Sequence, residues 1–286
     1  LEGTIPKIGN DSLIIKGDLK INSPLTTNNL TLLLLGNLEN NFPKLHINGT
    51  IIFTGNRNVT ISGEEEIFFE NFLLYSSGSV KLLQNISATN FTVKSGTVNL
   101  TNYSLEGEGT LTIENGAIMQ LRGTQRFPSR YTNYNLQSLS TVEYRGARQN
   151  VTAVPGGYGN LVLTGFDTKT IIENISINTN FIFDCNVNAK KSDITIYGNW
   201  VNQNGNFSSQ SSVIFAGEHT SVQGTSTVFH NVHVTQNSQT ILEQNIFADD
   251  IEVVGKLDAQ NYSLSATHNF SLGNYALLRT TSEGPF

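Results

Sequence analysis

The sequence predicts an all-β fold, a right-handed parallel β-helix (β-solenoid) with about 19 residues per rung. Three observations predict it. Apolar residues recur with a stride of 19, short runs alternate apolar and polar residues, and Gly, Asn or Asp separates these runs about every six residues. Such intervals leave no room for helices and fit three short strands per rung. A left-handed coil or an irregular solenoid would share the same period.

The stride appears in three runs along the chain. They are Ile15, Leu34, Phe53, Phe72 and Phe91; Tyr144, Leu163, Ile182 and Val201; and Phe215, Val234, Val253 and Leu272. A fixed period of about 20 residues is typical of solenoids, in which each turn stacks on the previous one. Inward residues should then form ladders along a narrow core, and we expect Leu74, Val93 and Ile113 to make one of them.

The expected strands follow in chain order, each with the period of two that marks a half-buried strand. The clearest lie at 19–21, 51–53, 80–82, 91–93, 98–100 and 111–113. We expect Trp200, Tyr144 and Tyr158 to pack in the solenoid wall. Cys185 is the only cysteine, which excludes an intrachain disulfide, and we expect it to be a small buried residue.

A longer repeat is superimposed on the rungs of a single elongated domain, residues 1–286. Its copies span roughly 36–106, 107–197 and 198–275. Each copy has an asparagine that begins an equivalent strand and a second asparagine fourteen residues later. The pairs are Asn71 and Asn85, Asn160 and Asn174, and Asn231 and Asn245. We predict that the second asparagines serve as turn residues or as stacked amide ladders.

The middle copy carries an insertion at 116–140, which should bulge from one face of the solenoid. Insertions in repeat proteins often form the binding face. This one contains the candidate contact patch, Arg126, Arg130, Tyr131 and Tyr134, because rigid aromatic residues and arginine are favoured at contact surfaces.

Composition narrows the functional classes. The formal net charge of −6 argues against nucleic-acid binding, which requires a basic stripe. No run reaches the length of about 18 apolar residues that a membrane span requires. The start, Leu1-Glu-Gly, lacks the features of a signal peptide, and neither end has a polar capping unit. We therefore expect a monomeric piece of a longer protein.

The sequence predicts no catalytic, cofactor-binding or metal-binding residues. Polysaccharide-acting β-helix enzymes gather carboxylates on successive rungs, whereas Glu64–Glu66 is a consecutive run in an expected turn. His230, Asp249 and His268 share the stride of 19 and should stack in one column. Such a stack spreads ligands along a line and not around a point, so we expect a polar surface column. His233 should face the opposite side of its strand and stay outside the column.

An ordered set of phrases resembles a known family. They are Phe127-Pro128, Ser140-Thr-Val-Glu-Tyr-Arg-Gly146, Gln149-Asn-Val151, Tyr158-Gly-Asn-Leu161 and Gly198-Asn-Trp-Val-Asn202. They resemble the repeat regions of very large cell-surface adhesins from gliding Bacteroidetes (SprB-like adhesins). The resemblance covers most of residues 30–275. It implies export by the type IX secretion system, display outside the cell at its surface, and a role in attachment and gliding motility.

The leading expectation is therefore a non-enzymatic structural and adhesive segment. Its partners would be an extracellular surface or glycan, or other segments of the same adhesin. One alternative is a polysaccharide-acting enzyme or carbohydrate-binding β-helix module, and another is a phage or autotransporter-type fibre, which would usually trimerise.

Overall fold

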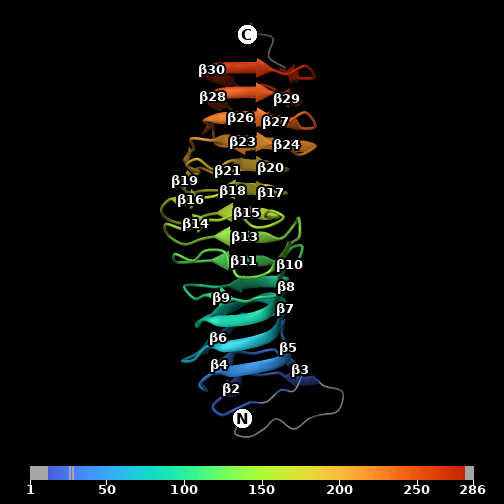
Figure 1. Cartoon of the computed structure of the whole chain (residues 1–286), viewed down its shortest axis with the longest axis vertical. Helices are drawn as coiled ribbons and strands as arrows, with labels where there is room; N and C mark the ends of the chain where they lie inside the picture. The colour runs from blue at the N-terminus through green and yellow to red at the C-terminus, as the bar shows by residue number, and fades with distance from the viewer. Residues whose placement is uncertain (1–11, 26, 28, 281–286) are drawn as a thin grey trace. The chain divides into compact units, whose positions relative to one another are not determined.

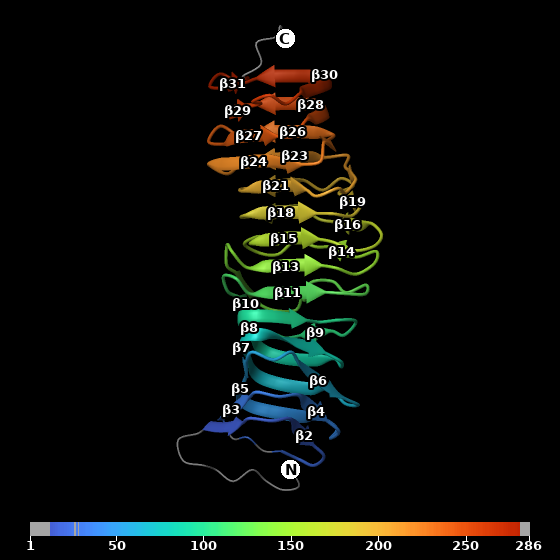
Figure 2. The same cartoon turned by 180° about the vertical axis from the view of Figure 1, so that it is seen from behind.

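The computed structural model describes residues 12–280 except 26 and 28. These residues form a β-solenoid of about 14 turns, with about 19 residues per turn and parallel strands stacked from one turn to the next. Figure 1 and Figure 2 show the stacked strands from opposite sides. No helix occurs within the described residues. The all-β, parallel, three-strand-per-rung prediction is confirmed.

The chain divides into two compact units, residues 1–143 and 144–286, which are described separately below. The division falls inside the second copy of the long repeat and within strand β13 (Thr141–Tyr144). It therefore does not coincide with a boundary of that repeat.

Three walls of parallel strands surround the core of the first unit. One wall contains β1 (Ser12–Ile15), β3 (Leu30–Leu34), β10 (Thr110–Ile113) and β12 (Asn133–Leu136). A second contains β2 (Leu19–Ile21), β4 (Leu38–Asn40), β6 (Val59–Gly63) and β11 (Ile118–Leu121). The third ends with β9 (Leu105–Glu106). The long strands β5 (Leu45–Gly55), β7 (Ile67–Leu82) and β8 (Ile86–Asn99) bend around the corners and serve two or three walls each.

The second unit also has three walls. The first contains β15 (Asn160–Leu163), β18 (Asn180–Phe183), β21 (Asn199–Asn202), β24 (His219–Gly224), β27 (Gln239–Glu243), β29 (Lys256–Asp258) and β31 (Leu277–Arg279). The second contains β14 (Asn150–Val151), β16 (Lys169–Ile171), β19 (Val187–Asn188) and β22 (Phe207–Ser208). Strand β25 (Thr227–Val228) contacts β22 and pairs with the first residues of β28, which then continues into the third wall. The third contains β17 (Ile175–Ile177), β20 (Ile194–Ile196), β23 (Ser212–Phe215), β26 (Asn231–Val234), β28 (Ile246–Val253) and β30 (Leu264–Leu272).

Strand register confirms part of the predicted stride. Phe215 pairs with Val234, which pairs with Val253, and Val253 pairs with Leu272. Leu74, Val93 and Ile113 form a second confirmed ladder. These residues are inward-facing and buried except in the last rung.

Two of the predicted runs slip out of register. Phe53 pairs with Leu74 and not with Phe72, because the rung between them is longer than the stride. Leu163 pairs with Phe183, so the stride reaches Ile182 and Val201 on the outward side of the wall. Turns of variable length absorb the difference, which a fixed stride cannot follow.

Alternation of inward apolar and outward polar residues builds the core of each unit. Phe72 stacks on Phe91 with ring centroids 4.4 Å apart in the first unit. In the second unit Trp200 is fully buried, with its ring 4.8–5.3 Å from four phenylalanines. These are Phe181, Phe183, Phe207 and Phe229. The predicted burial of Trp200 and Cys185 is confirmed.

Tyr144 and Tyr158 are also completely buried, as predicted for wall residues. Their hydroxyl oxygens lie 3.1 Å apart, and the Tyr158 hydroxyl donates to the Thr152 carbonyl at 2.6 Å. The pair therefore satisfies its polar atoms inside the core.

Residues 116–140, expected to bulge from one face, instead form part of the rung stack. They contain β11 and β12, which pair with β8 and β10. Thr110 pairs with Asn133, so this rung exceeds the usual stride by only a few residues. Burial of Met119, Leu121 and Leu136 on the inward side holds this segment in the wall.

The long repeat does not correspond to a whole number of rungs. From Asn160 the first wall of the second unit continues through Asn180, Asn199 and Ser221. The equivalent of Asn160 in the next copy, Asn231, begins β26 on the third wall, two walls beyond Ser221. Strands with equivalent sequences therefore lie on different walls.

Candidate functional site

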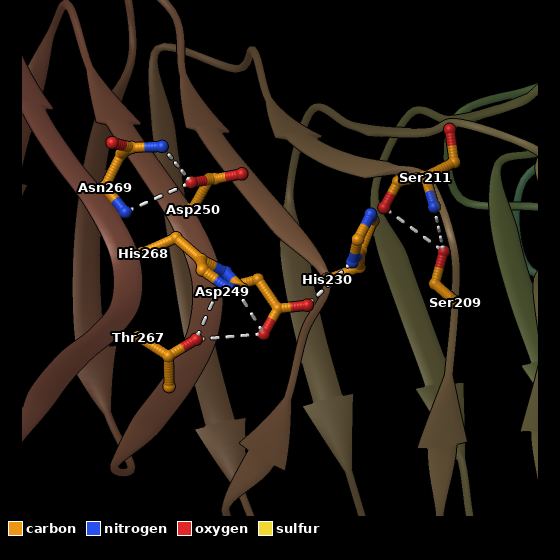
Figure 3. Close-up of polar contacts among 8 residues, drawn as sticks. All are labelled: Ser209, Ser211, His230, Asp249, Asp250, Thr267, His268 and Asn269. Atoms are coloured by element: carbon orange, nitrogen blue, oxygen red, sulfur yellow. Dashed lines mark hydrogen bonds and ion pairs between the residues drawn. The ribbon is translucent and has the colours of Figure 1, made fainter.

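The predicted column of His230, Asp249 and His268 exists in the second unit, as Figure 3 shows. Asp249 lies between the two imidazoles. One carboxylate oxygen is 2.8 Å from His230 Nδ1, and the other is 3.9 Å from His268 Nδ1. The Thr267 hydroxyl donates to Asp249 Oδ1 at 3.0 Å. The carboxylate thus joins three consecutive rungs along the surface.

Backbone geometry places these side chains. His230 lies in the turn that precedes β26, and both Asp249 and Asp250 donate their backbone N–H to its carbonyl, at 2.9 and 3.1 Å. A register shift between Ala248 and Asp250 marks the same corner. The column therefore follows a corner of the solenoid, where side chains project into solvent.

Hydrogen bonding to His230 lowers the pKa of the Asp249 carboxyl below its ordinary value of 3.8. The hydrogen bond from Thr267 and the charges of His230 and His268 act in the same direction. The column favours an ionised aspartate held by donors from two neighbouring rungs.

A second polar column runs beside the first. Asp250 accepts the backbone N–H of Asn269 at 3.1 Å and its side-chain amide at 2.7 Å (Figure 3). His233 approaches Glu252 at 2.9 Å, in a separate contact. His233 stays outside the first column as predicted, although the reason differs, because His230 lies in a turn where strand alternation does not apply.

The described residues contain no group of three or more His, Cys, Asp or Glu side chains that could hold a metal ion. Within the columns each carboxylate makes its contacts along the stacking direction. Glu64–Glu66 are exposed in the turn between β6 and β7, as predicted. The carboxylates of the two columns form ionic and hydrogen-bonded links between successive rungs.

The four residues of the predicted contact patch occupy three different environments in the first unit. Arg126 and Arg130 are exposed, and Arg130 Nη1 lies 2.6 Å from Glu106 Oε2. Tyr134 is half-buried and donates its hydroxyl to the Pro128 carbonyl at 3.1 Å. Tyr131 is buried, and burial raises the pKa of its hydroxyl. Only the two arginines of this patch offer exposed side chains, and their contact role stays a prediction.

The repeated asparagines are turn residues, as predicted. Asn85, Asn174 and Asn245 each accept, through Oδ1, a backbone N–H from the next rung. The donors are Ser104, Asp193 and Ser263, at 2.9, 2.9 and 2.8 Å. Stacked amide pairs also occur, at Asn71 and Asn90 and along Asn160, Asn180 and Asn199.

One buried lysine was not predicted from the sequence. Lys169 is fully buried in the second unit, and its Nζ donates to the Gly146 carbonyl at 2.7 Å and the Phe166 carbonyl at 3.1 Å. Burial lowers its pKa from 10.5. Its inward place in the alternating run Lys169-Thr-Ile171 was the available signal.

The fold and its polar columns define a parallel β-solenoid with laddered surface side chains. No family model, curated protein or solved structure matches the chain significantly. Within the part of the chain that the structure describes, no helix has the length and apolar character needed to cross a membrane.

Proposed function

We propose that this chain is a non-enzymatic structural and adhesive segment of a filamentous bacterial cell-surface adhesin. Its role would be surface attachment and, in a gliding cell, motility. The resemblance to SprB-like adhesins supports export and display outside the cell. Its partners would be extracellular surfaces or glycans.

One observation carries this proposal: the repeated phrases coincide with repeated contacts between rungs. Asn85, Asn174 and Asn245 occupy one repeat position and make the same hydrogen bond to the following rung. The phrase Asn-Tyr-Ser-Leu at 102–105 and at 261–264 likewise follows equivalent turns. A wall that can be extended by repeating its own phrases suits a long surface filament.

Adhesion would arise from many weak contacts on such a wall. Linked weak sites bind strongly because later contacts form at high effective concentration. The exposed Arg126 and Arg130 are the proposed contact residues, and Lys190 and Lys191, which are also exposed, provide a basic pair for comparison.

The test uses beads coated with the purified chain at increasing density. We expect retention on glycan-coated or abiotic surfaces to rise steeply with coating density, while soluble polysaccharides stay uncut. The double variant Arg126→Glu/Arg130→Glu should lose retention, and Lys190→Glu/Lys191→Glu should lose less. Release of oligosaccharides from pectin or alginate would contradict the proposal and favour the polysaccharide-acting alternative.

A further inference from the structure

A hollow of about 410 Å³ lies on the surface of the first unit, at the carboxyl ends of three stacked strands. The strands are β7, β8 and β11, which pair with one another in that order on the second wall. Side chains from three successive rungs line the hollow. They include Lys81, Leu83, Asn99, Tyr103 and Arg122. Its volume is within the range of small-ligand sites.

Two cationic side chains line this hollow without a carboxylate partner. Lys81 projects outward between the buried Val80 and Leu82, and Arg122 follows the buried Leu121. Neither cation forms an ion pair with any residue that the structure describes, although the chain has a net charge of −6. Arg122 Nε is buried and has no hydrogen-bond acceptor among those residues. Because an unpaired buried donor is costly, the stability of the wall does not account for this arginine.

The same hollow also has an apolar side. Tyr103 and Leu83 are 36% and 37% exposed. Between the cations, the Asn99 amide donates to Gln120 Oε1 at 3.2 Å, so the middle strand of the hollow is held in place. An exposed aromatic ring beside two cations suits a ligand with one apolar face and one negative charge.

An equivalent corner occurs in the second unit without these charges. Lys81 pairs with Asn99 in the first unit, and Ile241 pairs with Asp258 in the second. In both units the second member of the pair accepts, through Oδ1, the backbone N–H two residues further on, at 3.0 Å. The corner therefore folds in the same way with isoleucine and aspartate at these places, and the fold does not require the lysine.

We propose that this hollow binds a uronate residue of an anionic polysaccharide. The Arg122 guanidinium and the Lys81 ammonium bind the sugar carboxylate, and the Tyr103 ring packs against one face of the sugar. The planar fork of arginine matches the geometry of a carboxylate. This inference deepens the adhesive function proposed above and rests on it, because it names the class of glycan that the partner contains.

Isothermal titration calorimetry of the full chain with a short oligogalacturonate tests the site. The methyl-esterified, uncharged counterpart is the second ligand. We expect saturable binding of the charged oligosaccharide that weakens as salt is added, and at least about tenfold weaker binding of the neutral one. Arg122→Gln and Lys81→Ile should each weaken binding of the charged ligand at least about tenfold, because each removes a charge-assisted contact.

Two further variants separate local contacts from effects on the fold and on net charge. Asn99→Asp places a negative charge beside Lys81 and should weaken binding, while its turn keeps the hydrogen bond that Asp258 makes and the melting temperature stays unchanged. Lys94→Gln is the matched control. Lys94 is an exposed lysine of the same unit that lies outside the hollow, with its Nζ 5.2 Å from the centroid of the Tyr75 ring. Its loss should change the affinity less than about twofold.

Absence of saturable binding, equal binding of the neutral oligosaccharide, or an equal loss in Lys94→Gln would overturn the proposal. Tighter binding of a sulfated oligosaccharide of equal charge would overturn the assignment of a carboxylate ligand. The site and the adhesive role fail separately. Bead retention without oligogalacturonate binding would contradict this site alone, whereas oligogalacturonate binding without bead retention would contradict the adhesive role alone.

Discussion

Lys169 shows, at the residue scale, how the wall accepts a charged side chain. Lysine is rarely fully buried without partners, and here two main-chain carbonyls, of Gly146 and Phe166, accept from its Nζ. Alternation in Lys169-Thr-Ile171 indicates that Lys169 points inward, whereas a lysine side chain is ordinarily expected at the surface. The sequence could not predict the outcome because the carbonyls come from turns whose geometry has no residue signature.

A pH series tests the cost of burying Lys169. Its pKa is below 10.5 in the folded state and ordinary in the unfolded state, so the unfolded chain binds more protons between these values. Stability contributed by this group therefore rises with pH. We expect the unfolding free energy of the wild type, minus that of Lys169→Met, to increase from about pH 7 to about pH 10.

Urea denaturation measures this difference. Cys185 titrates near Lys169, and burial raises the pKa of its thiol, so both proteins should carry Cys185→Ala. A difference that stays constant or falls with pH would contradict the prediction.

Asp249 provides a second test at the residue scale, in the acidic pH range. His230, Thr267 and His268 face its carboxylate, and their contacts depress its pKa. The depressed pKa contributes stability above the unfolded-state value, and this contribution disappears as pH falls through the folded-state pKa, below 3.8. The melting temperature of the wild type should exceed that of Asp249→Asn at pH 7. The two should converge in acid, and parallel curves would contradict this.

At the element scale, the recurring turn at Asn174 makes a measurable contribution to the unfolding free energy. Its Oδ1 accepts the Asp193 N–H at 2.9 Å, linking two rungs. Asn174→Ala should lower the unfolding free energy by about 0.5–1.5 kcal/mol. Asn174→Asp keeps the acceptor and should lose less. Chemical denaturation of both variants checks this, and an equal loss would show that the hydrogen bond is not the cause.

Strand β21 carries the largest buried side chain of the second unit. Replacing Trp200 with alanine removes its packing against four phenylalanines and its Nε1 contact with Thr227 Oγ1 at 3.4 Å. We expect a loss of about 3–5 kcal/mol in unfolding free energy. Val201→Ala, on the outward side of the same strand, is the control and should cost far less. Similar losses for the two variants would contradict the inward packing of Trp200.

The existence of the strands was predictable from the sequence, whereas their exact register was not. The run from Phe215 to Leu272 kept the stride because every rung between them has the same length. The run through Phe53 departs from the stride because the rung from β5 to β7 is longer than 19 residues, so Phe53 pairs with Leu74. The His230 column was predictable because its members keep the spacing of 19 even across the register shift at Ala248–Asp250. Burial of Tyr131 was not predictable, because it depends on how the preceding turn folds back.

At the scale of the whole molecule, all described ladders connect neighbouring rungs. This holds where paired residues are closer in sequence than the usual stride, as in Gln239 and Lys256. It also holds where they are further apart in sequence, as in Thr110 and Asn133. Contacts between distant parts of the sequence are therefore relayed through intervening rungs. In such proteins stability is approximately a sum of neighbour terms.

This connectivity predicts a local response to mutation. Phe72→Ala should accelerate hydrogen exchange in β5, β7 and β8. These strands carry the phenylalanines whose rings contact Phe72, namely Phe53, Phe69 and Phe91. Exchange in β26 should stay unchanged. Hydrogen exchange followed by mass spectrometry of peptides measures both regions, and uniform acceleration across the chain would contradict the neighbour model.

The mismatch between the long repeat and the rung has a geometric consequence for recognition. Asn160 and Asn231 begin equivalent strands, yet they lie on different walls of the second unit. The outward side chains of equivalent strands therefore project in different directions around the solenoid axis. A flat surface laid against one wall would therefore meet different repeat residues in successive copies.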